Sequence, residues 1–303
     1  MEEAGLGADM ARKIPTSPRT TAKKIAEGTL DAIKALKYKT ASGRTISLDK
    51  LVTPAVRRSK LYDPDWKVNL ADKERNESPA ISVTRESTLE AAARLADKRP
   101  CVLNFASAKH PGGDFLQGAL AQEESIARSS ALYHTLIQHP EYYEENKRSQ
   151  KDNIGIYLNY AIYSPDVPVI RNDQGDWLDE PYTTSVVTSP APNRRAILDN
   201  AEDELSGSEI TTALYIAQVF YNRMGQVLAI MAENNHRTIV LGAWGCGVFG
   251  NDPELVASLF KKALKQLPYF DEVVFAIYDA PDSEVYKAFE EVFGEKCEGN
   301  SAQ

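Results

Sequence analysis

Few cysteines, no long apolar run and no excess of basic charge characterise this sequence of 303 residues. Its three cysteines, Cys101, Cys246 and Cys297, are widely spaced, so they suggest neither a disulfide framework nor a zinc site of paired cysteines. No apolar run approaches the roughly 20 residues that cross a bilayer, and the N-terminus lacks the basic and apolar regions of a signal peptide. We therefore expect a soluble intracellular protein, cytoplasmic or nuclear, with no membrane partner.

The charge balance is acidic, with 43 Asp and Glu against 35 Lys and Arg and a formal net charge of −8 at pH 7. This balance argues against a broad nucleic-acid footprint and restricts any such contact to a local groove. Apolar residues make up 43% of the chain, which is enough to bury a sizeable core. The composition predicts a globular protein with one large domain, or a domain with an extension.

The N-terminal part of the chain differs in pattern from the remainder. A tail without periodicity precedes residues 21–36, whose apolar side chains have near-helical spacing, and residues 38–48 resemble a hairpin. We expect residues 1–75 to form an N-terminal extension that packs on a core of residues 76–303.

Strand-like and helix-like segments alternate through this core. Short apolar or β-branched runs predict strands at residues 80–84, 101–105, 154–163, 182–188, 238–243 and 273–278. Helical periodicity predicts helices at residues 87–97, 120–137, 208–235, 252–267 and 283–292, the first of them opened by a capping box. Such alternation favours an α/β sandwich with a mixed or parallel sheet.

The most informative stretch, residues 104–124, joins a strand-like run to a glycine turn and then to two adjacent carboxylates. Pro111-Gly112-Gly113 gives a turn at which a ligand approaches bare backbone, and Gln122-Glu123-Glu124 opens a helical segment. Adjacent residues on a helix point about 100° apart, so this pair is not expected to flank one bond as in an ordinary glycosidase. We expect one Glu to act as acid/base while its neighbour binds. The alternative is that both merely complement the helix dipole.

A second glycine loop, residues 242–252, lies between a β-branched strand and a helix. Backbone N–H groups and a helix N-terminus attract phosphate at such a position, so the loop resembles a diphosphate cradle. It also fits the dinucleotide fingerprint, but no acidic residue follows at a second strand end, which argues against a Rossmann dehydrogenase. The alternative is a tight turn without a ligand.

Together these motifs resemble the microbial-type poly(ADP-ribose) glycohydrolase family, whose members have a macrodomain fold. The family signature is a Gly-Gly-Gly turn followed after six to eight residues by Gln-Glu-Glu, and here Gly112-Gly113-Asp114 precedes Gln122-Glu123-Glu124 by seven residues. The resemblance extends from about residue 21 to residue 292. It implies a three-layer α/β sandwich with a mixed sheet between helices and an N-terminal helical extension.

The resemblance also implies roles for individual residues. Glu124 would be the catalytic acid/base, Glu123 would hold the ribose hydroxyls, and Asn104 would orient the terminal ribose. The other ligand-binding residues would be those of the two glycine loops and the first motif residue of the helix: Gly112, Gly113, Asp114, Gln122, Gly245, Cys246, Gly247, Val248 and Phe249. No metal and no cofactor are implied.

The implied reaction is hydrolysis of the ribose–ribose O-glycosidic bond of poly(ADP-ribose), with release of ADP-ribose. The partners would be ADP-ribose or its polymer on modified protein, or ADP-ribosylated nucleic acid. Two other functions stay open: removal of mono-ADP-ribose from protein or a nucleobase, and binding of ADP-ribose without cleavage. Asp114 departs from the family's third glycine, and its side chain and charge could narrow the site, repel phosphate or bind a ribose hydroxyl.

Overall fold

The computed structural model describes residues 17–151, 154–204, 209–280 and 282–294. The tail before residue 17, Ser208 at the predicted start of the long helix, and Cys297 lie outside the described residues. Seven strands form one sheet in the order β3-β6-β7-β5-β8-β9-β4, in which β7, β5, β8, β9 and β4 are parallel neighbours. β6 pairs antiparallel with both β7 and β3, so the sheet is mixed.

The strands of this sheet have the bounds β3 (Lys60–Tyr62), β4 (Ala80–Thr84), β5 (Cys101–Phe105), β6 (Ala161–Arg171), β7 (Trp177–Ser189), β8 (Thr238–Leu241) and β9 (Glu272–Ala276). The helices are α1 (Pro18–Lys34), α2 (Asp49–Arg57), α3 (Thr88–Arg94), α4 (Gln122–Ser129), α5 (Leu132–Leu136), α6 (Pro140–Ser149), α7 (Arg194–Glu204), α8 (Glu209–Glu233), α9 (Pro253–Gln266) and α10 (Glu284–Phe293). A separate hairpin joins β1 (Lys37–Lys39) to β2 (Thr45–Ser47), as predicted.

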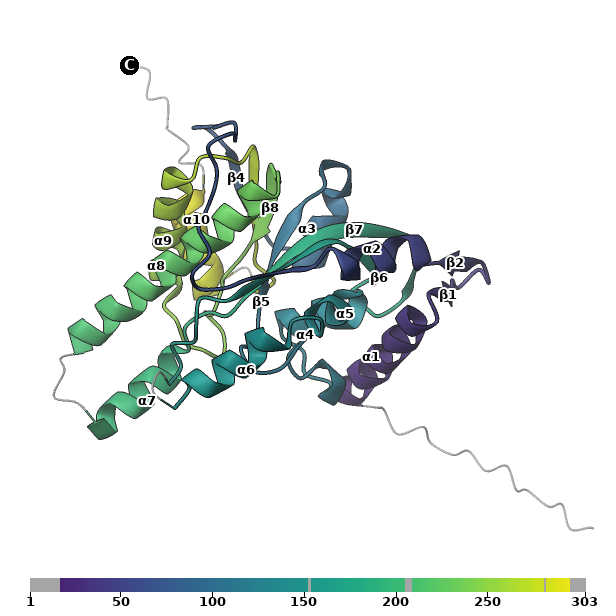
Figure 1. Cartoon of the computed structure of the whole chain (residues 1–303), viewed down its shortest axis with the longest axis horizontal. Helices are drawn as coiled ribbons and strands as arrows, with labels where there is room; N and C mark the ends of the chain where they lie inside the picture. Colours follow the sequence, from purple (N-terminus) through teal and green to yellow (C-terminus); the bar gives the residue numbers. More distant parts are fainter. Residues whose placement is uncertain (1–16, 152–153, 205–208, 281, 295–303) are drawn as a thin grey trace, which may run out of the picture.

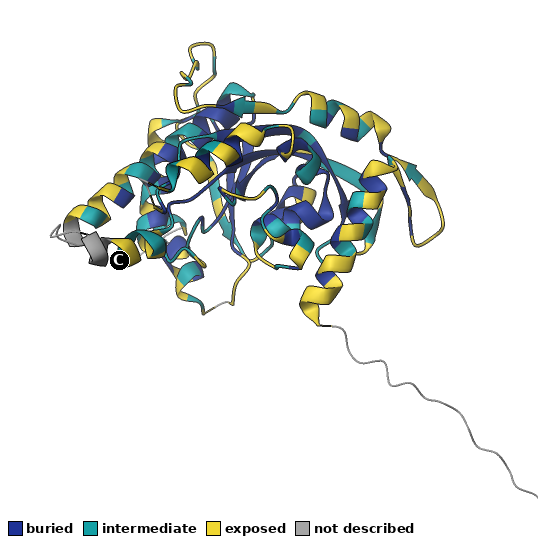
Figure 2. Cartoon of the chain, turned by 60° about the horizontal axis from the view of Figure 1, so that its bottom comes forward, coloured by how far each residue is buried: buried dark blue, intermediate teal, exposed yellow. Residues whose placement is uncertain are grey.

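Helices cover both faces of the sheet, which confirms the three-layer sandwich (Figure 1). Successive residues of β5 point to opposite faces, so Leu103 belongs to a core cluster with α8, α9 and α10, whereas Val102 belongs to a second cluster. That second cluster includes side chains from α1, α2, α3, α4, α5 and α6. Figure 2 shows the buried sheet in the middle and exposed residues on the outer sides of the helices.

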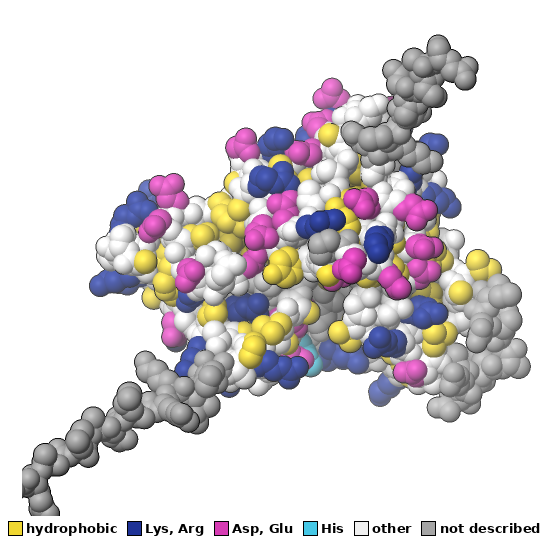
Figure 3. All heavy atoms as spheres, turned by 180° about the vertical axis from the view of Figure 1, so that it is seen from behind, with side chains coloured by type: hydrophobic (Ala, Val, Ile, Leu, Met, Phe, Trp, Pro, Cys, Tyr) yellow, Lys and Arg dark blue, Asp and Glu magenta, His cyan; other side chains and the backbone are white. Residues whose placement is uncertain are grey.

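Acidic and basic side chains are interspersed over the molecular face drawn in Figure 3. None of the helices in the described part of the chain is long and apolar enough to cross a membrane.

One predicted helix and one predicted strand are wrong. The predicted helix of residues 120–137 is divided into α4 and α5 at Ser130, which is extended and forms a bridge with Val169. The Ser130 hydroxyl donates to the Ile126 carbonyl and accepts from the Leu132 N–H, so it replaces helical hydrogen bonds. The predicted strand of residues 154–163 begins only at Ala161, because its first half is held as a loop by a buried arginine described below.

Three helices, α2, α6 and α7, were not predicted. Pro140 does not simply end the preceding helix. It occupies the first turn of α6, where a missing N–H costs nothing, so the proline that stops one helix also starts the next.

The N-terminal extension is fastened to the core by polar contacts beneath α1. Arg171 on β6 donates to the Thr29 hydroxyl (2.9 Å), and Thr29 donates to the Arg128 carbonyl on α4 (2.7 Å). The Arg171 guanidinium also lies over the Trp177 ring, 3.2 Å from its centroid. In addition, β3 supplies the edge strand beside β6. The expected extension therefore shares the sheet with the core, and its boundary at residue 75 stays a prediction.

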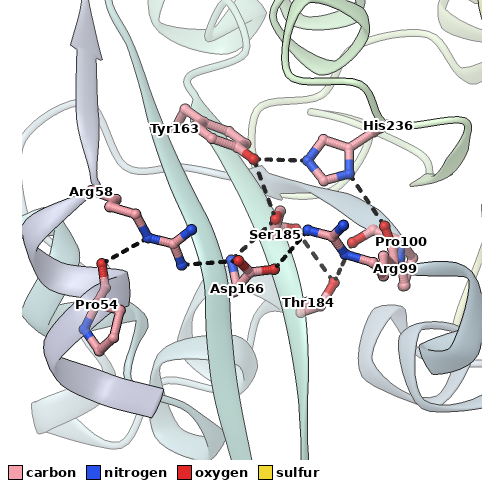
Figure 4. Close-up of polar contacts among 9 residues, drawn as sticks. All are labelled: Pro54, Arg58, Arg99, Pro100, Tyr163, Asp166, Thr184, Ser185 and His236. Atoms are coloured by element: carbon pink, nitrogen blue, oxygen red, sulfur yellow. Dashed lines mark hydrogen bonds and ion pairs between the residues drawn. The ribbon is translucent and has the colours of Figure 1, made fainter. Parts of the chain in front are cut away.

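A polar network that includes the buried His236 lies at the amino ends of β5 and β8 (Figure 4). His236 Nε2 is 2.8 Å from the Tyr163 hydroxyl, and Nδ1 is 3.2 Å from the Arg99 carbonyl. Asp166 nearby pairs with Arg58 (2.9 Å) and with Arg99 (3.7 Å). Burial lowers the pKa of His236 below its ordinary value.

This lowered pKa predicts an acid-sensitive fold. The unfolded chain binds a proton at His236 more readily than the folded one, so the free energy of unfolding falls as the pH drops below the ordinary histidine pKa of about 6.5. His236→Gln should make this decline shallower in urea unfolding measured between about pH 7 and pH 5. The exposed His110→Gln serves as control and should keep the parent's slope. Equal slopes for the parent and His236→Gln would contradict this prediction.

Candidate active site

Two loops meet at one edge of the sheet because β5 and β8 are parallel neighbours. The first loop leads from β5 to α4, and the second leads from β8 to α9. Together they border a cavity of about 730 Å³ that is lined by Glu123, Glu124, Gly245, Gly247 and Phe249 among others. The structure therefore brings the two sequence motifs into one cavity.

Gln122 fixes the start of α4 on the end of β5. β5 pairs with β8 only at Cys101 and Val102, and beyond these residues the Gln122 amide takes the place of a strand. Its Oε1 accepts from the Phe105 N–H (2.9 Å), and its Nε2 donates to the Leu103 carbonyl (2.8 Å) and to the Thr88 hydroxyl (3.1 Å). Because both amide protons are used within the protein, we assign Gln122 a positioning role. Its predicted contact with a ligand stays a prediction.

Glu123 is nearly inaccessible, with an exposed fraction of 3%. It accepts hydrogen bonds from the Ser107 N–H (2.6 Å) and from Asn104 Nδ2 (3.2 Å). Burial raises the pKa of Glu123 to about 8, and the hydrogen bonds from Ser107 and Asn104 oppose that rise.

Asn104 is fully buried and is not part of the cavity lining. Its amide nitrogen donates both to Glu123 and to the Thr188 hydroxyl on β7 (3.2 Å). The observed contacts make Asn104 a support for Glu123, and its predicted contact with the terminal ribose stays a prediction.

Glu124 is half-buried and is held by the backbone of the glycine turn. Its Oε1 accepts from the Asp114 N–H at 3.0 Å. Gly113 has a φ of +61°, and a Cβ at this position would overlap Glu124 Oε1. Glycine is therefore required at this position both by the backbone angle and by the closeness of the carboxylate.

Asp114 does not need the conformational freedom of glycine. Its φ is −102°, which any residue adopts, and its side chain is 64% exposed. Asp114 Oδ1 lies 3.5 Å from His110 Nδ1. The departure from the family's third glycine thus leaves the turn and its N–H contact to Glu124 intact.

In the second loop, some backbone groups are hydrogen-bonded to Asn251, whereas three successive N–H groups are free within the part of the chain that the structure describes. Asn251 donates to the carbonyls of Gly245 (3.0 Å) and Pro192 (2.8 Å). Among the described residues, the N–H groups of Gly247, Val248 and Phe249 have no acceptor. Successive free N–H groups are the kind of donors that bind anions, and the predicted contact of this loop with a diphosphate stays a prediction.

Cys246 is not one of the residues with a free N–H group, because its N–H donates to the Ala243 carbonyl. Burial raises the pKa of its thiol to about 12, so the group is a thiol near pH 7. Its side chain lines a second cavity of about 460 Å³, which shares Phe105, Ala243 and Gly247 with the first cavity. Cys246 lies in the second glycine loop, but its side chain lines the neighbouring cavity, and its predicted contact with a ligand stays a prediction.

The sequence patterns missed three residues that shape the site. Ser107 supplies the N–H that binds Glu123, and Tyr157 lines the cavity with its ring 6.3 Å from that of Phe249. Arg223 on α8 is fully buried and donates to the carbonyls of Ile156, Tyr157 and Pro190 and to the Asn159 side chain. It holds Tyr157 in a left-handed conformation (φ 61°), and no local pattern signals this long-range contact.

Within the described ranges, no three His, Cys, Asp or Glu side chains are grouped closely enough to hold a metal ion.

Comparison with known proteins agrees with this geometry. Residues 26–172 match the family described as microbial-type PARG, catalytic domain. The chain is 41% identical to poly(ADP-ribose) glycohydrolase from Thermomonospora curvata, with 90% of this chain and 100% of that chain covered and a TM-score of 0.81.

Two further similar structures illustrate the ligands that such proteins bind. One is the Thermomonospora curvata enzyme bound to the inhibitor ADP-HPD, 42% identical over 90% of this chain and 100% of that one, with a TM-score of 0.79. The other is the enzyme from Deinococcus radiodurans in complex with ADP-ribose, 34% identical over 80% of this chain and 96% of that one, with a TM-score of 0.69. A comparison with curated proteins found no match. The chain belongs to the microbial-type poly(ADP-ribose) glycohydrolase family, with its macrodomain-like fold.

Proposed function

We propose that this protein hydrolyses the ribose–ribose O-glycosidic bond of poly(ADP-ribose) and releases ADP-ribose. One observation carries the proposal: a single cavity combines the half-buried Glu124, held by the Asp114 N–H, with the free N–H groups of residues 247–249. A carboxyl group and a row of free N–H donors in one cavity match a ligand that has both a glycosidic bond and a diphosphate.

The two adjoining cavities suggest how ADP-ribose lies. The diphosphate occupies the N–H groups of Gly247, Val248 and Phe249, because these donors have no other acceptor among the described residues. The distal ribose then reaches Glu123 and Glu124. The adenosine half continues past Gly247 into the second cavity, which the largely exposed Tyr278 borders with an aromatic ring.

Glu124 performs the acid and base steps. As a carboxylic acid it gives its proton to the departing ribose oxygen while the bond from C1 to that oxygen breaks and oxocarbenium charge develops at C1. Water then bonds to C1 and gives a proton to the Glu124 carboxylate, which restores the acid. Glu123, fixed by Ser107 and Asn104, binds the ribose hydroxyls and orients C1.

The substrate class can be tested by offering three ADP-ribosylated substrates to the purified chain: the polymer, a mono-ADP-ribosylated protein and ADP-ribosylated DNA. The proposal expects free ADP-ribose chiefly from the polymer. Release only from the mono-modified protein or only from the DNA would replace the proposed polymer by that substrate. ADP-ribose binding without release from any of the three would indicate a binding protein.

The predicted diphosphate site has its own test. Val248→Pro removes one free N–H and should weaken ADP-ribose binding by about tenfold or more, since hydrogen bonds to charged groups are among the strong ones. Val248→Ala keeps the N–H, and its side chain is 77% exposed in the parent, so its affinity should match that of the parent. Isothermal titration calorimetry of both variants with ADP-ribose measures the difference. Equal affinities would show that the diphosphate does not bind to this loop.

A further inference from the structure

Arg19 contributes a charged side chain to the active-site cavity from the N-terminal extension. It lies in the first turn of α1 and lines the same cavity as Glu123 and Glu124. Among the residues that line this cavity, the other Lys or Arg is Lys109. A segment far from both glycine loops in the sequence therefore reaches the site.

The position of Arg19 is fixed by the fold. α1 is capped by Ser17, whose hydroxyl accepts from the Thr20 N–H (3.2 Å), and Pro18 occupies its first turn. Gly118, with a φ of +79°, faces the helix start so closely that a Cβ on Gly118 would overlap the Arg19 carbonyl. The start of α1 thus rests directly on the loop that leads to α4.

The local structure does not explain the charge of Arg19. A cation in the first helical turn opposes the helix dipole, and the first turn of α1 has no acidic residue. Among the described residues, the Arg19 guanidinium has no ion pair and no hydrogen-bond acceptor. An arginine that opposes the dipole of its own helix, and that has no partner among the residues the structure describes, is available to a ligand.

We propose that Arg19 is a substrate-binding residue whose guanidinium binds phosphate oxygens of the polymer. This inference rests on the proposed function. Each ADP-ribose unit carries a diphosphate, and a guanidinium matches two phosphate oxygens with parallel N–H donors. The diphosphate that Arg19 contacts belongs either to the unit being released or to the unit next to it. The N-terminal extension thereby takes part in binding and does not only pack on the core.

The test compares Arg19→Gln with Lys23→Gln in the full chain. Lys23 is an exposed cation on the same helix that does not line the cavity, so both variants lose one charge. Arg19→Gln should raise the KM for poly(ADP-ribose) by about tenfold with kcat within about twofold, and should make the dependence of KM on salt shallower. Arg19→Lys should recover part of the loss. Arg19→Gln should not melt below Lys23→Gln, because both side chains are exposed and the loss of Arg19 removes a cation that opposes the helix dipole.

Direct titration with ADP-ribose and with the polymer shows which diphosphate Arg19 contacts, that of the released unit or that of the adjacent unit. Equal losses for ADP-ribose and polymer would place Arg19 on the released unit, and a loss for polymer alone would place it on the adjacent unit. If Arg19→Gln and Lys23→Gln have the same KM and the same affinities within about twofold, the inference is wrong. A parent that releases no ADP-ribose would instead contradict the proposed function, and the two binding titrations would still test Arg19.

Discussion

Replacing Glu124 by Gln is expected to reduce the turnover of poly(ADP-ribose) by about 10²–10⁴-fold, the usual contribution of a positioned acid/base. Binding of ADP-ribose should stay within a few-fold of the parent value. The amide oxygen of Gln can still accept from the Asp114 N–H, so the turn around Gly113 keeps its geometry. Rates of ADP-ribose release and titration with ADP-ribose measure the two quantities separately.

Asp114→Asn is the matched control for this variant. It neutralises a neighbouring carboxylate that is exposed, and it leaves the backbone N–H that contacts Glu124. Turnover should stay within about tenfold of the parent, well above that of Glu124→Gln. Hydrolysis by Glu124→Gln at the parent rate would show that Glu124 is not the catalytic acid/base.

Gly113→Ala should have the second largest effect, because one methyl group would displace the catalytic carboxylate. The new Cβ would overlap Glu124 Oε1, so either the turn or the carboxylate must move. Misplacement of a catalytic group by about 1 Å costs on the order of 10²-fold in rate. A left-handed alanine should also lower the free energy of unfolding by about 1–2 kcal/mol. Steady-state kinetics and urea unfolding measure these effects.

Asp114→Ala is the control for Gly113→Ala. It shows whether any alanine in this turn lowers stability, or only one whose Cβ overlaps Glu124. Asp114→Ala changes a side chain that is exposed at a backbone angle that any residue adopts. Its unfolding free energy should lie within about 0.5 kcal/mol of the parent value. Equal activity of Gly113→Ala and the parent would show that Glu124 does not need the observed contact with this turn.

The parts of the site that follow each other in the chain could be predicted from the sequence. The strand of residues 101–105, the Gly112-Gly113 turn and the helix start at Gln122 each have a local signal. The structure places them in that order, with β5 before α4. The second loop was equally recognisable, because its glycines stand between a β-branched strand and a helix with Asp252 as its N-cap.

The parts that depend on distant segments could not be predicted. Arg223 holds Tyr157 from 66 positions away, and this contact turns the first half of a strand-like run into a loop. Arg19 reaches the cavity only because α1 packs on Gly118. Ser130 interrupts a helix-like segment because it pairs with Val169 on β6. The sequence around Ser130 does not indicate that β6 lies beside it. In each case a tertiary contact outweighs local propensity.

The central claim is that the Glu124 cavity cleaves poly(ADP-ribose). Its most direct test is chromatographic detection of free ADP-ribose after incubation of the purified chain with the polymer, with Glu124→Gln in parallel and ADP-ribose binding measured for both. We expect release by the parent, almost none by Glu124→Gln, and similar binding by both. Binding by both proteins with no release by the parent would contradict the claim and would identify the cavity as a site that binds ADP-ribose without cleaving it.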